Sequence, residues 1–206
     1  MQTLAQYILL TPVILFSLSI HEFAHAWMAN KLGDPTAKNE GRLTLNPIKH
    51  IDPIGLIAFF ILKFGWAKPV PVNPYNFKNL DRDDMLVSAA GPASNFIIAL
   101  IVGLAIRIWL MAGNIAPAAF YMLRLALFMN LALAIFNLIP VFPLDGSHIL
   151  RSLLPTEKKI TFDQTKHYGP FILIGLIMLG NFTGISILGI IIFPFVNFFT
   201  RIFAGI

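Results

Sequence analysis

The sequence contains no cysteine and few charged residues. Without cysteine, disulfide bonds and thiolate metal ligands are excluded, so any metal site must use histidine, aspartate or glutamate. Charged residues make up 12% of the 206 positions and apolar residues 57%, whereas soluble domains contain about 25% charged residues. So few charges cannot cover a water-soluble protein of this size. The composition therefore predicts a membrane-embedded chain and excludes disordered, coiled-coil, collagen-like and nucleic-acid-binding proteins.

Several apolar stretches are long enough to cross a bilayer as helices, which takes about 20 residues. The first thirty positions contain no lysine or arginine, so they lack the basic start of a signal peptide, and we expect a retained first helix. The last stretch fits either one tilted helix or two helices broken near Gly180–Gly184. We therefore predict an all-α polytopic membrane protein with four to five transmembrane helices, over about residues 4–31, 85–111, 121–141 and 171–203.

Basic residues gather in two of the expected connections between these helices. The 31–84 connection holds eight, the 142–170 connection holds four, and the 112–120 connection holds none. The positive-inside rule places both basic connections in the cytoplasm, with the N-terminus outside. The apolar run 54–62 is too short to cross, so we expect a re-entrant or interfacial segment.

Two runs in the first long connection, 41–47 and 67–73, alternate as short strands or a hairpin would. In the second run, Pro69 and Pro71 would remove the amide donors from one edge. The other edge, with Lys68, Val70 and Val72, keeps its donors. This edge could bind an extended client peptide, and it could equally be a covered edge strand.

The first expected helix carries the motif His21-Glu22-Phe23-Ala24-His25. Residues four apart share one face of a helix, so both imidazoles can reach one metal ion. Glu22 is placed to reach a water molecule on that metal. Polar groups of this kind are costly inside a membrane and are functional by default. Nitrogen ligands with one oxygen ligand suit Zn²⁺, one ion per chain. His50 and His167 lie among loop charges and are expected to be solvated.

The third ligand must come from another part of the chain, and Asp145 is the best candidate. It lies in the run 137–146, which follows the third expected helix at the predicted cytoplasmic face. The second half of the first helix approaches the same face. Two alternatives stay open: Asp145 could cap a short helix beginning at Gly146, and His148 could be the ligand.

These motifs together give the chain a resemblance to the site-2 protease family of intramembrane zinc metalloproteases, in the compact group without a PDZ domain. The resemblance rests on HEFAH, GRLTLNP (41–47), GWAKPVPVNP (65–74), AAGPASN (89–95) and NLIPVFPLDG (137–146). It implies that His21, His25 and Asp145 bind zinc and that Glu22 is the catalytic base. It also implies a single metalloprotease domain over 1–206, with a catalytic core over about 1–155 and a C-terminal transmembrane region over about 168–206.

The function that follows from the resemblance is hydrolysis of peptide bonds in transmembrane protein substrates near the cytoplasmic face of a cell membrane, in a prokaryote. Asn137, Asn95 and the edge with Lys68, Val70 and Val72 are candidate substrate contacts. For Asn137 the alternative is local satisfaction of its own helix end, and for Asn95 it is helix packing. A metal-ion transporter and a catalytically silent client-binding relative are the alternative functions.

Overall fold

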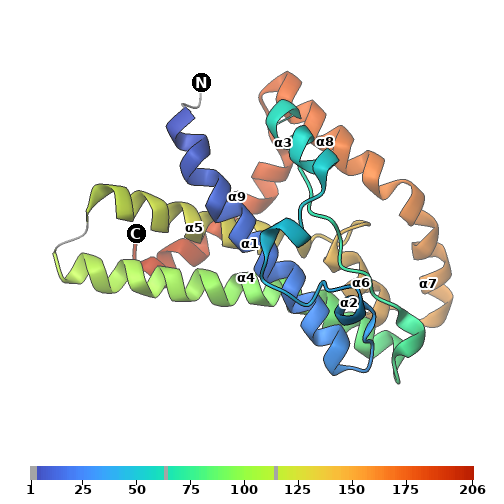
Figure 1. Cartoon of the computed structure of the whole chain (residues 1–206). Helices are drawn as coiled ribbons and strands as arrows, with labels where there is room; N and C mark the ends of the chain where they lie inside the picture. The colour runs from blue at the N-terminus through green and yellow to red at the C-terminus, as the bar shows by residue number, and fades with distance from the viewer. Residues whose placement is uncertain (1–3, 63–64, 114–115) are drawn as a thin grey trace.

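The computed structural model describes residues 4–62, 65–113 and 116–206, and almost all of its regular structure is helical (Figure 1). The prediction of an all-α fold is confirmed. Nine α-helices lie in the described residues: α1 Leu4–Lys31, α2 Thr36–Asn39, α3 Pro53–Leu62, α4 Leu80–Met111, α5 Pro117–Asn137, α6 Asp145–Leu153, α7 Thr156–Asp163, α8 Gly169–Thr183 and α9 Ile187–Ala204. Three 3₁₀ turns lie between them, at Pro47–Lys49, Pro74–Asn76 and Gln164–His167.

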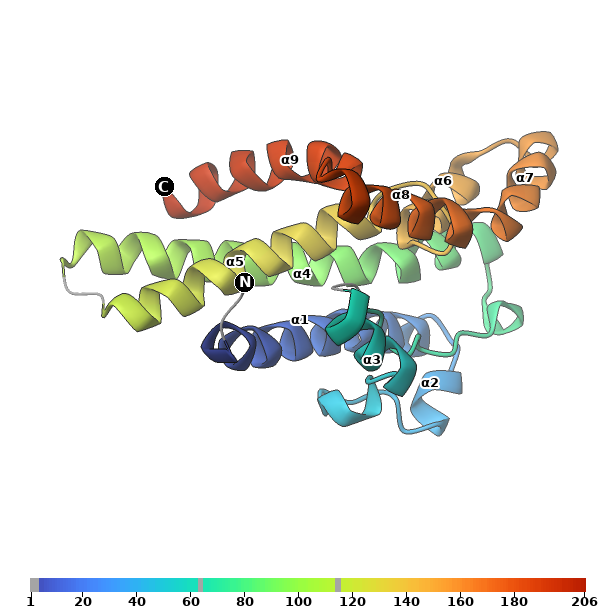
Figure 2. The same cartoon turned by 90° about the horizontal axis from the view of Figure 1, so that it is seen from above.

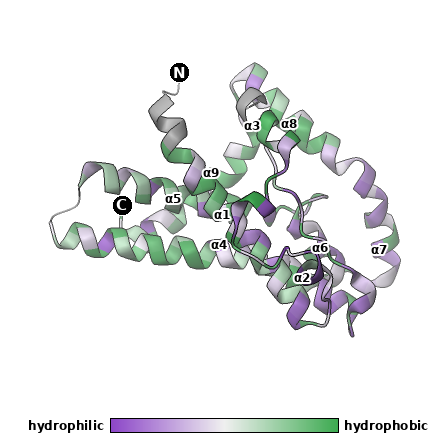
Figure 3. Cartoon of the chain, viewed as in Figure 1, coloured by the Kyte–Doolittle hydropathy of each residue, from purple (hydrophilic) through white to green (hydrophobic). Residues whose placement is uncertain are grey.

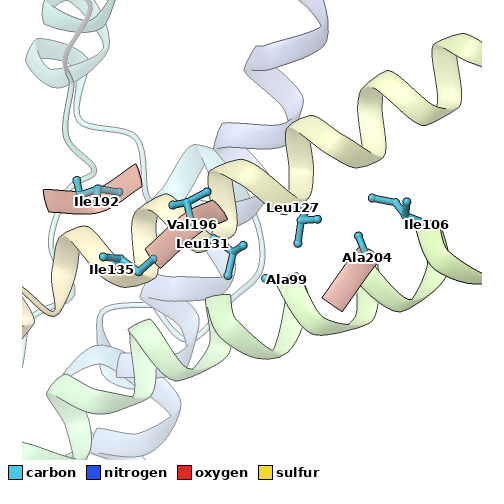
Figure 4. Packing of buried hydrophobic residues seen from close by; sticks show 8 residues of the cluster. All are labelled: Ala99, Ile106, Leu127, Leu131, Ile135, Ile192, Val196 and Ala204. Atoms are coloured by element: carbon cyan, nitrogen blue, oxygen red, sulfur yellow. The ribbon is translucent and has the colours of Figure 1, made fainter. Parts of the chain in front are cut away.

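Four of these helices are long and apolar enough to cross a membrane: Leu9–Lys31 of α1, α4, α5 and α9. The chain is therefore a multi-pass membrane protein. Helix α4 packs against α1, α5 and α9, and α5 also contacts α1 and α9 (Figure 2). The apolar core is shared by α4, α5 and α9 (Figure 4), where Leu127 and Leu131 of α5 meet Ala99 of α4 and Val196 of α9. This core lies beside the polar site described below.

Hydrophilic residues concentrate at one end of the bundle, around α2, α6 and α7, while the opposite ends of α4 and α5 are mostly apolar (Figure 3). The first long connection leaves α1 through α2 at this hydrophilic end, runs out to α3 and returns to the same end at the start of α4, and the connection from α5 to α8 passes through α6 and α7 there (Figure 1). The two basic connections are therefore on the same side of the bundle, as the positive-inside argument requires.

The C-terminal stretch forms two helices. Gly184 ends α8 with a left-handed backbone (φ +74°), a conformation that glycine adopts without steric cost. The Ser186 side chain then accepts a hydrogen bond from the Gly189 amide and starts α9. Fifteen residues make α8 about 22 Å long, short of the roughly 30 Å hydrocarbon core, while α9 is among the four candidate spans.

The expected strands are absent from the described residues, which contain one isolated antiparallel bridge, between Ile51 and Ala67. The small strand or hairpin elements predicted for 41–47 and 67–73 are therefore not found beyond this bridge. The reason is that a side chain, and not a ladder of amides, joins the two runs: the Arg42 guanidinium donates to the carbonyl oxygens of Lys68 (2.7 Å) and Pro69 (3.1 Å). The apolar run 54–62 forms most of α3, ten residues long, and its position in a bilayer stays a prediction.

Candidate active site

The structure brings His21, His25 and Asp145 together from α1 and the start of α6. The Nε2 atoms of the two histidines are 3.0 Å apart, and Asp145 carboxylate oxygens lie 3.2 Å from His21 Nε2 and 3.4 Å from His25 Nε2. Two ligands at 2.0–2.1 Å from a tetrahedral zinc ion are about 3.3 Å from each other. The two imidazole nitrogens are about this far apart, and each has a different oxygen of the Asp145 carboxylate at about this distance, so the three side chains can share one metal ion.

Helix α4 fixes the tautomers of both histidines. The Val87 carbonyl oxygen lies 2.7 Å from His25 Nδ1, and a carbonyl only accepts, so Nδ1 carries the proton. The Asn95 amide nitrogen donates to the Ser17 carbonyl, which turns the amide oxygen toward His21 Nδ1 at 2.7 Å. Both Nε2 atoms are then lone-pair donors aimed at the same point, as metal-ligating imidazoles require.

This arrangement of donor atoms fits a bound cation. Two Nε2 lone pairs and a carboxylate converge within hydrogen-bond distance, yet no proton is available between them in these neutral tautomers. Asp145 Oδ2 is buried and has no hydrogen-bond donor, a state that costs about 1–3 kcal/mol or more for a charged group.

The alternatives for the third ligand are not supported. Helix α6 begins at Asp145 itself, and no side chain caps its N-terminus, so Asp145 is not an N-cap residue. His148 lies outside the three-residue cluster, and its Nδ1 is 3.1 Å from Asp84 Oδ2. His148 thus borders the site, paired with a carboxylate of α4.

The Glu22 side chain contacts the first long connection, which runs between α1 and α4. The Val70 amide donates to Glu22 Oε2 over 3.0 Å, which leaves the second carboxylate oxygen to accept a proton. Val70 is held in place by the preceding backbone, where Arg42 binds the carbonyls of Lys68 and Pro69 and the Lys68 amide donates to the His50 carbonyl. The loop therefore orients the Glu22 carboxylate.

A mostly apolar cavity of about 720 Å³ contains these groups. Its floor holds His21, Glu22, His25 and Asp145, and one wall is the loop with Trp66, Val70 and Val72. The other wall is helix α8, which contributes Leu173, Ile174, Ile177 and Met178. The cavity has the size of an ordinary ligand pocket, and an apolar segment fits its walls.

The structure decides between interpretations of three sets of residues near the site. Asn95 has no exposed surface, contacts the His21 ring and does not line the cavity. His50 is 2% exposed and donates from Nε2 to the Thr44 carbonyl, so it is not solvated. On the proposed client edge, the Lys68 and Val70 amides already have the acceptors described above.

The other predicted positions agree with the structure in part. Val70 and Val72 line the cavity and Lys68 does not. Asn137 also lines it, while its amide donates to the Leu133 carbonyl one turn back, as the local alternative predicted. His167 is exposed as expected.

Two contributions of α4 to the site were not predicted from the sequence: the Val87 carbonyl that accepts from His25, and the space at Gly91. A side chain at Gly91 would lie 2.4 Å from His25 Nε2, so this glycine leaves the space in which both imidazoles pack. Val87, Gly91 and Asn95 follow one another at intervals of four and so share one helix face. This spacing of four residues is the sequence signal that could have identified the face of α4 that meets the HEFAH motif.

Comparison with known proteins agrees with this geometry. Residues 104–180 match Peptidase family M50. The "Putative zinc metalloprotease YwhC" of Bacillus subtilis (strain 168) is 42% identical over 173 residues, which cover 81% of this chain and 78% of that protein. The chain belongs to peptidase family M50, the site-2 protease family.

Two less similar proteins also match. A "Putative zinc metalloprotease Rip2" of Mycolicibacterium smegmatis is 32% identical over 178 residues, which cover 84% of this chain and 67% of that protein. The "Zinc metalloprotease MJ0392" of Methanocaldococcus jannaschii is 32% identical over 143 residues, 69% of this chain and 33% of that protein. No solved structure matches this M50 chain.

Proposed function

We propose that this M50 metalloprotease is an intramembrane zinc endopeptidase in which His21, His25 and Asp145 hold one zinc ion and Glu22 is the general base. The observation that carries the proposal is the convergence of three metal-binding side chains, with two imidazole nitrogens 3.0 Å apart and a carboxylate oxygen 3.2–3.4 Å from each, beside the Glu22 carboxylate in one mostly apolar cavity. When bound, zinc supplies a Lewis acid that polarises the scissile carbonyl and makes water acidic enough to attack near neutral pH.

Glu22 performs the proton transfers. One carboxylate oxygen accepts a hydrogen bond from the Val70 amide, and this bond fixes the orientation of the carboxylate group in the cavity. The other oxygen takes the proton of the attacking water and delivers it to the leaving amine. Asn137 borders the cavity and is a candidate contact for the substrate, since its side-chain oxygen is not used in the bond to Leu133.

The substrate enters between the loop 66–72 and helix α8. Both walls are apolar, which suits a transmembrane segment of another protein. A helix hides its peptide bonds in its own hydrogen bonds, so the segment must unwind before cleavage. The hydrophilic end of the bundle, which holds the basic connections, faces the cytoplasm, and the N-terminus lies outside.

A transporter would use a series of sites along a path. Among residues 4–62, 65–113 and 116–206, one cluster of three metal-binding side chains is found, and it is the cluster at His21. A silent client-binding protein would have no use for a base held in the metal site. The geometry thus favours hydrolysis.

The test is cleavage of single-span transmembrane substrates in liposomes by wild type and by Glu22→Gln, with zinc measured in both proteins. We expect the wild type to cleave and Glu22→Gln to keep its zinc but lose at least 100-fold in rate, a typical contribution of a general base. Substrates with glycine or proline near the scissile bond should be cleaved faster than alanine-rich ones. Equal cleavage by both proteins, or no zinc in either after metal supplementation, would refute the assignment.

A further inference from the structure

A second polar cluster lies behind the metal site and does not border the cavity. It consists of Ser17 on α1, Asn95 on α4 and Asn130 on α5, each at most 1% exposed. Polar side chains inside membrane-spanning helices are costly unless they are bonded and useful. Asn95 contacts His21, whereas Ser17 and Asn130 belong to no motif and their side chains contact no predicted ligand.

The hydrogen bonds of this cluster have a single consistent direction. The Ser17 hydroxyl donates to the Val13 carbonyl (2.8 Å), so its oxygen must accept from Asn130 Nδ2 (2.9 Å). Asn130 Nδ2 also donates to the Ala126 carbonyl, which turns Oδ1 toward Asn95. Asn130 Oδ1 then accepts from Asn95 Nδ2 (2.9 Å).

The directions of these hydrogen bonds therefore determine which ring nitrogen of His21 carries the proton. Asn95 can present only its oxygen to His21, because its nitrogen donates both to Asn130 and to the Ser17 carbonyl. His21 must then protonate Nδ1 and keep the Nε2 lone pair for the metal. Reversing the Asn95 amide would bring an N–H against Nδ1 and favour the opposite tautomer.

We infer that Asn130, with Ser17, is a positioning residue for the metal centre: it fixes the amide orientation of Asn95 and thereby the metal-binding tautomer of His21. The inference rests on the proposed role of His21 as a zinc ligand. Partners behind a metal ligand typically contribute 10–100-fold to metal affinity. Helix α5, which supplies no ligand, thus helps the Ser17 carbonyl to set the Asn95 orientation on which zinc binding by α1 depends.

The structure offers a matched control on the same helix as Ser17. Ser19 is also 1% exposed, and its hydroxyl donates to the Leu15 carbonyl four residues back, as that of Ser17 does to Val13. Only Ser17 accepts a hydrogen bond from Asn130. Ser17→Ala and Ser19→Ala therefore remove the same atoms from similar surroundings and differ in the connection to His21.

The experiment measures zinc affinity by competition with a chelator, on the purified full chain, together with the visible spectrum of the Co²⁺-loaded protein. Asn130→Leu should weaken zinc binding 10–100-fold and change the Co²⁺ spectrum. Ser17→Ala should weaken it less, and Ser19→Ala should match wild type.

The comparison of Ser17→Ala with Ser19→Ala separates positioning from packing. If Asn130→Leu is folded and binds zinc as wild type does, the inference is overturned. If Asn130→Leu does not fold, the comparison of Ser17→Ala with Ser19→Ala decides, and equal affinities refute the inference. His21→Ala tests the underlying assignment separately: if it keeps wild-type zinc affinity, the proposed ligand set is wrong.

Discussion

Gly91→Ala is the smallest change that should disable the metal site. The new methyl group would lie 2.4 Å from His25 Nε2, 2.6 Å from His25 Cε1 and 2.7 Å from His21 Cε1, whereas ordinary contact begins near 3.4 Å. The His25 ring would have to retreat by about 1 Å. It cannot do so freely, because Val87 holds its Nδ1 and the ring is buried.

The size of the effect follows from the tolerance of a zinc site. Ligand distances are held within about 0.2 Å, so a shift of about 1 Å removes His25 from coordination. We expect zinc affinity to fall at least 100-fold, which corresponds to about 2.7 kcal/mol. The change in helix propensity at position 91 should not destabilise α4, since alanine is a better helix former than glycine.

The assay is zinc affinity by chelator competition, with the thermal unfolding midpoint of the metal-free protein as the measure of folding. Gly175→Ala, in α8, is the matched control because no atom lies within 4 Å of its new methyl group. Gly103→Ala should destabilise the fold against Phe203 without loss of zinc affinity. A folded Gly91→Ala protein with wild-type zinc affinity would refute the packing argument.

Further substitutions test the surroundings of the site. Arg42→Lys should lower kcat roughly 10-fold with zinc content unchanged, because a single ammonium nitrogen cannot reproduce the planar guanidinium whose two nitrogens hold the Pro69 and Lys68 carbonyls. Val70 would then lose its position at Glu22, which steady-state kinetics beside metal analysis checks. His148→Ala should keep its zinc, which metal analysis would show. Hydrogen bonds from Thr36, Asn76 and Asn73 outweigh burial and lower the pKa of Asp34. Asp34 therefore stabilises the fold above its unfolded pKa of about 3.9 and loses this effect as pH falls below it. Asp34→Asn should flatten the fall in thermal midpoint between pH 5 and roughly pH 3.

Much of the site could be predicted from the sequence because its signals are local or topological. The spacing of His21 and His25 places both on one face of any helix, and their burial within an apolar run marks them as functional. Asp145 followed from the end of the third span and the common depth of two segments. The predicted helix bounds differ by a few residues at their ends: α4 begins at Leu80, where the Asn79 side chain caps it, instead of near residue 85.

The errors arise where long-range packing decides the structure. Alternation in 41–47 and 67–73 resembles strands, but nothing local shows that Arg42 reaches across and replaces a strand ladder. His50 has charged neighbours in sequence, yet folding buries it beside Arg42. The role of Asn95 depends on which face of α4 meets α1, and that register is not encoded within either helix alone.

The register between α1 and α4 also couples folding to metal binding. One face of α4 supplies the Val87 carbonyl, the space at Gly91 and the Asn95 amide, each aimed at a histidine of α1. A slide by one residue moves a helix 1.5 Å and turns it by about 100°, which would bring a bulkier neighbour of Gly91 against the imidazoles. Zinc can therefore bind tightly only in the native register, and by linkage zinc must stabilise that register. Zinc binding would thus stabilise the arrangement of α1 and α4 that forms its own site.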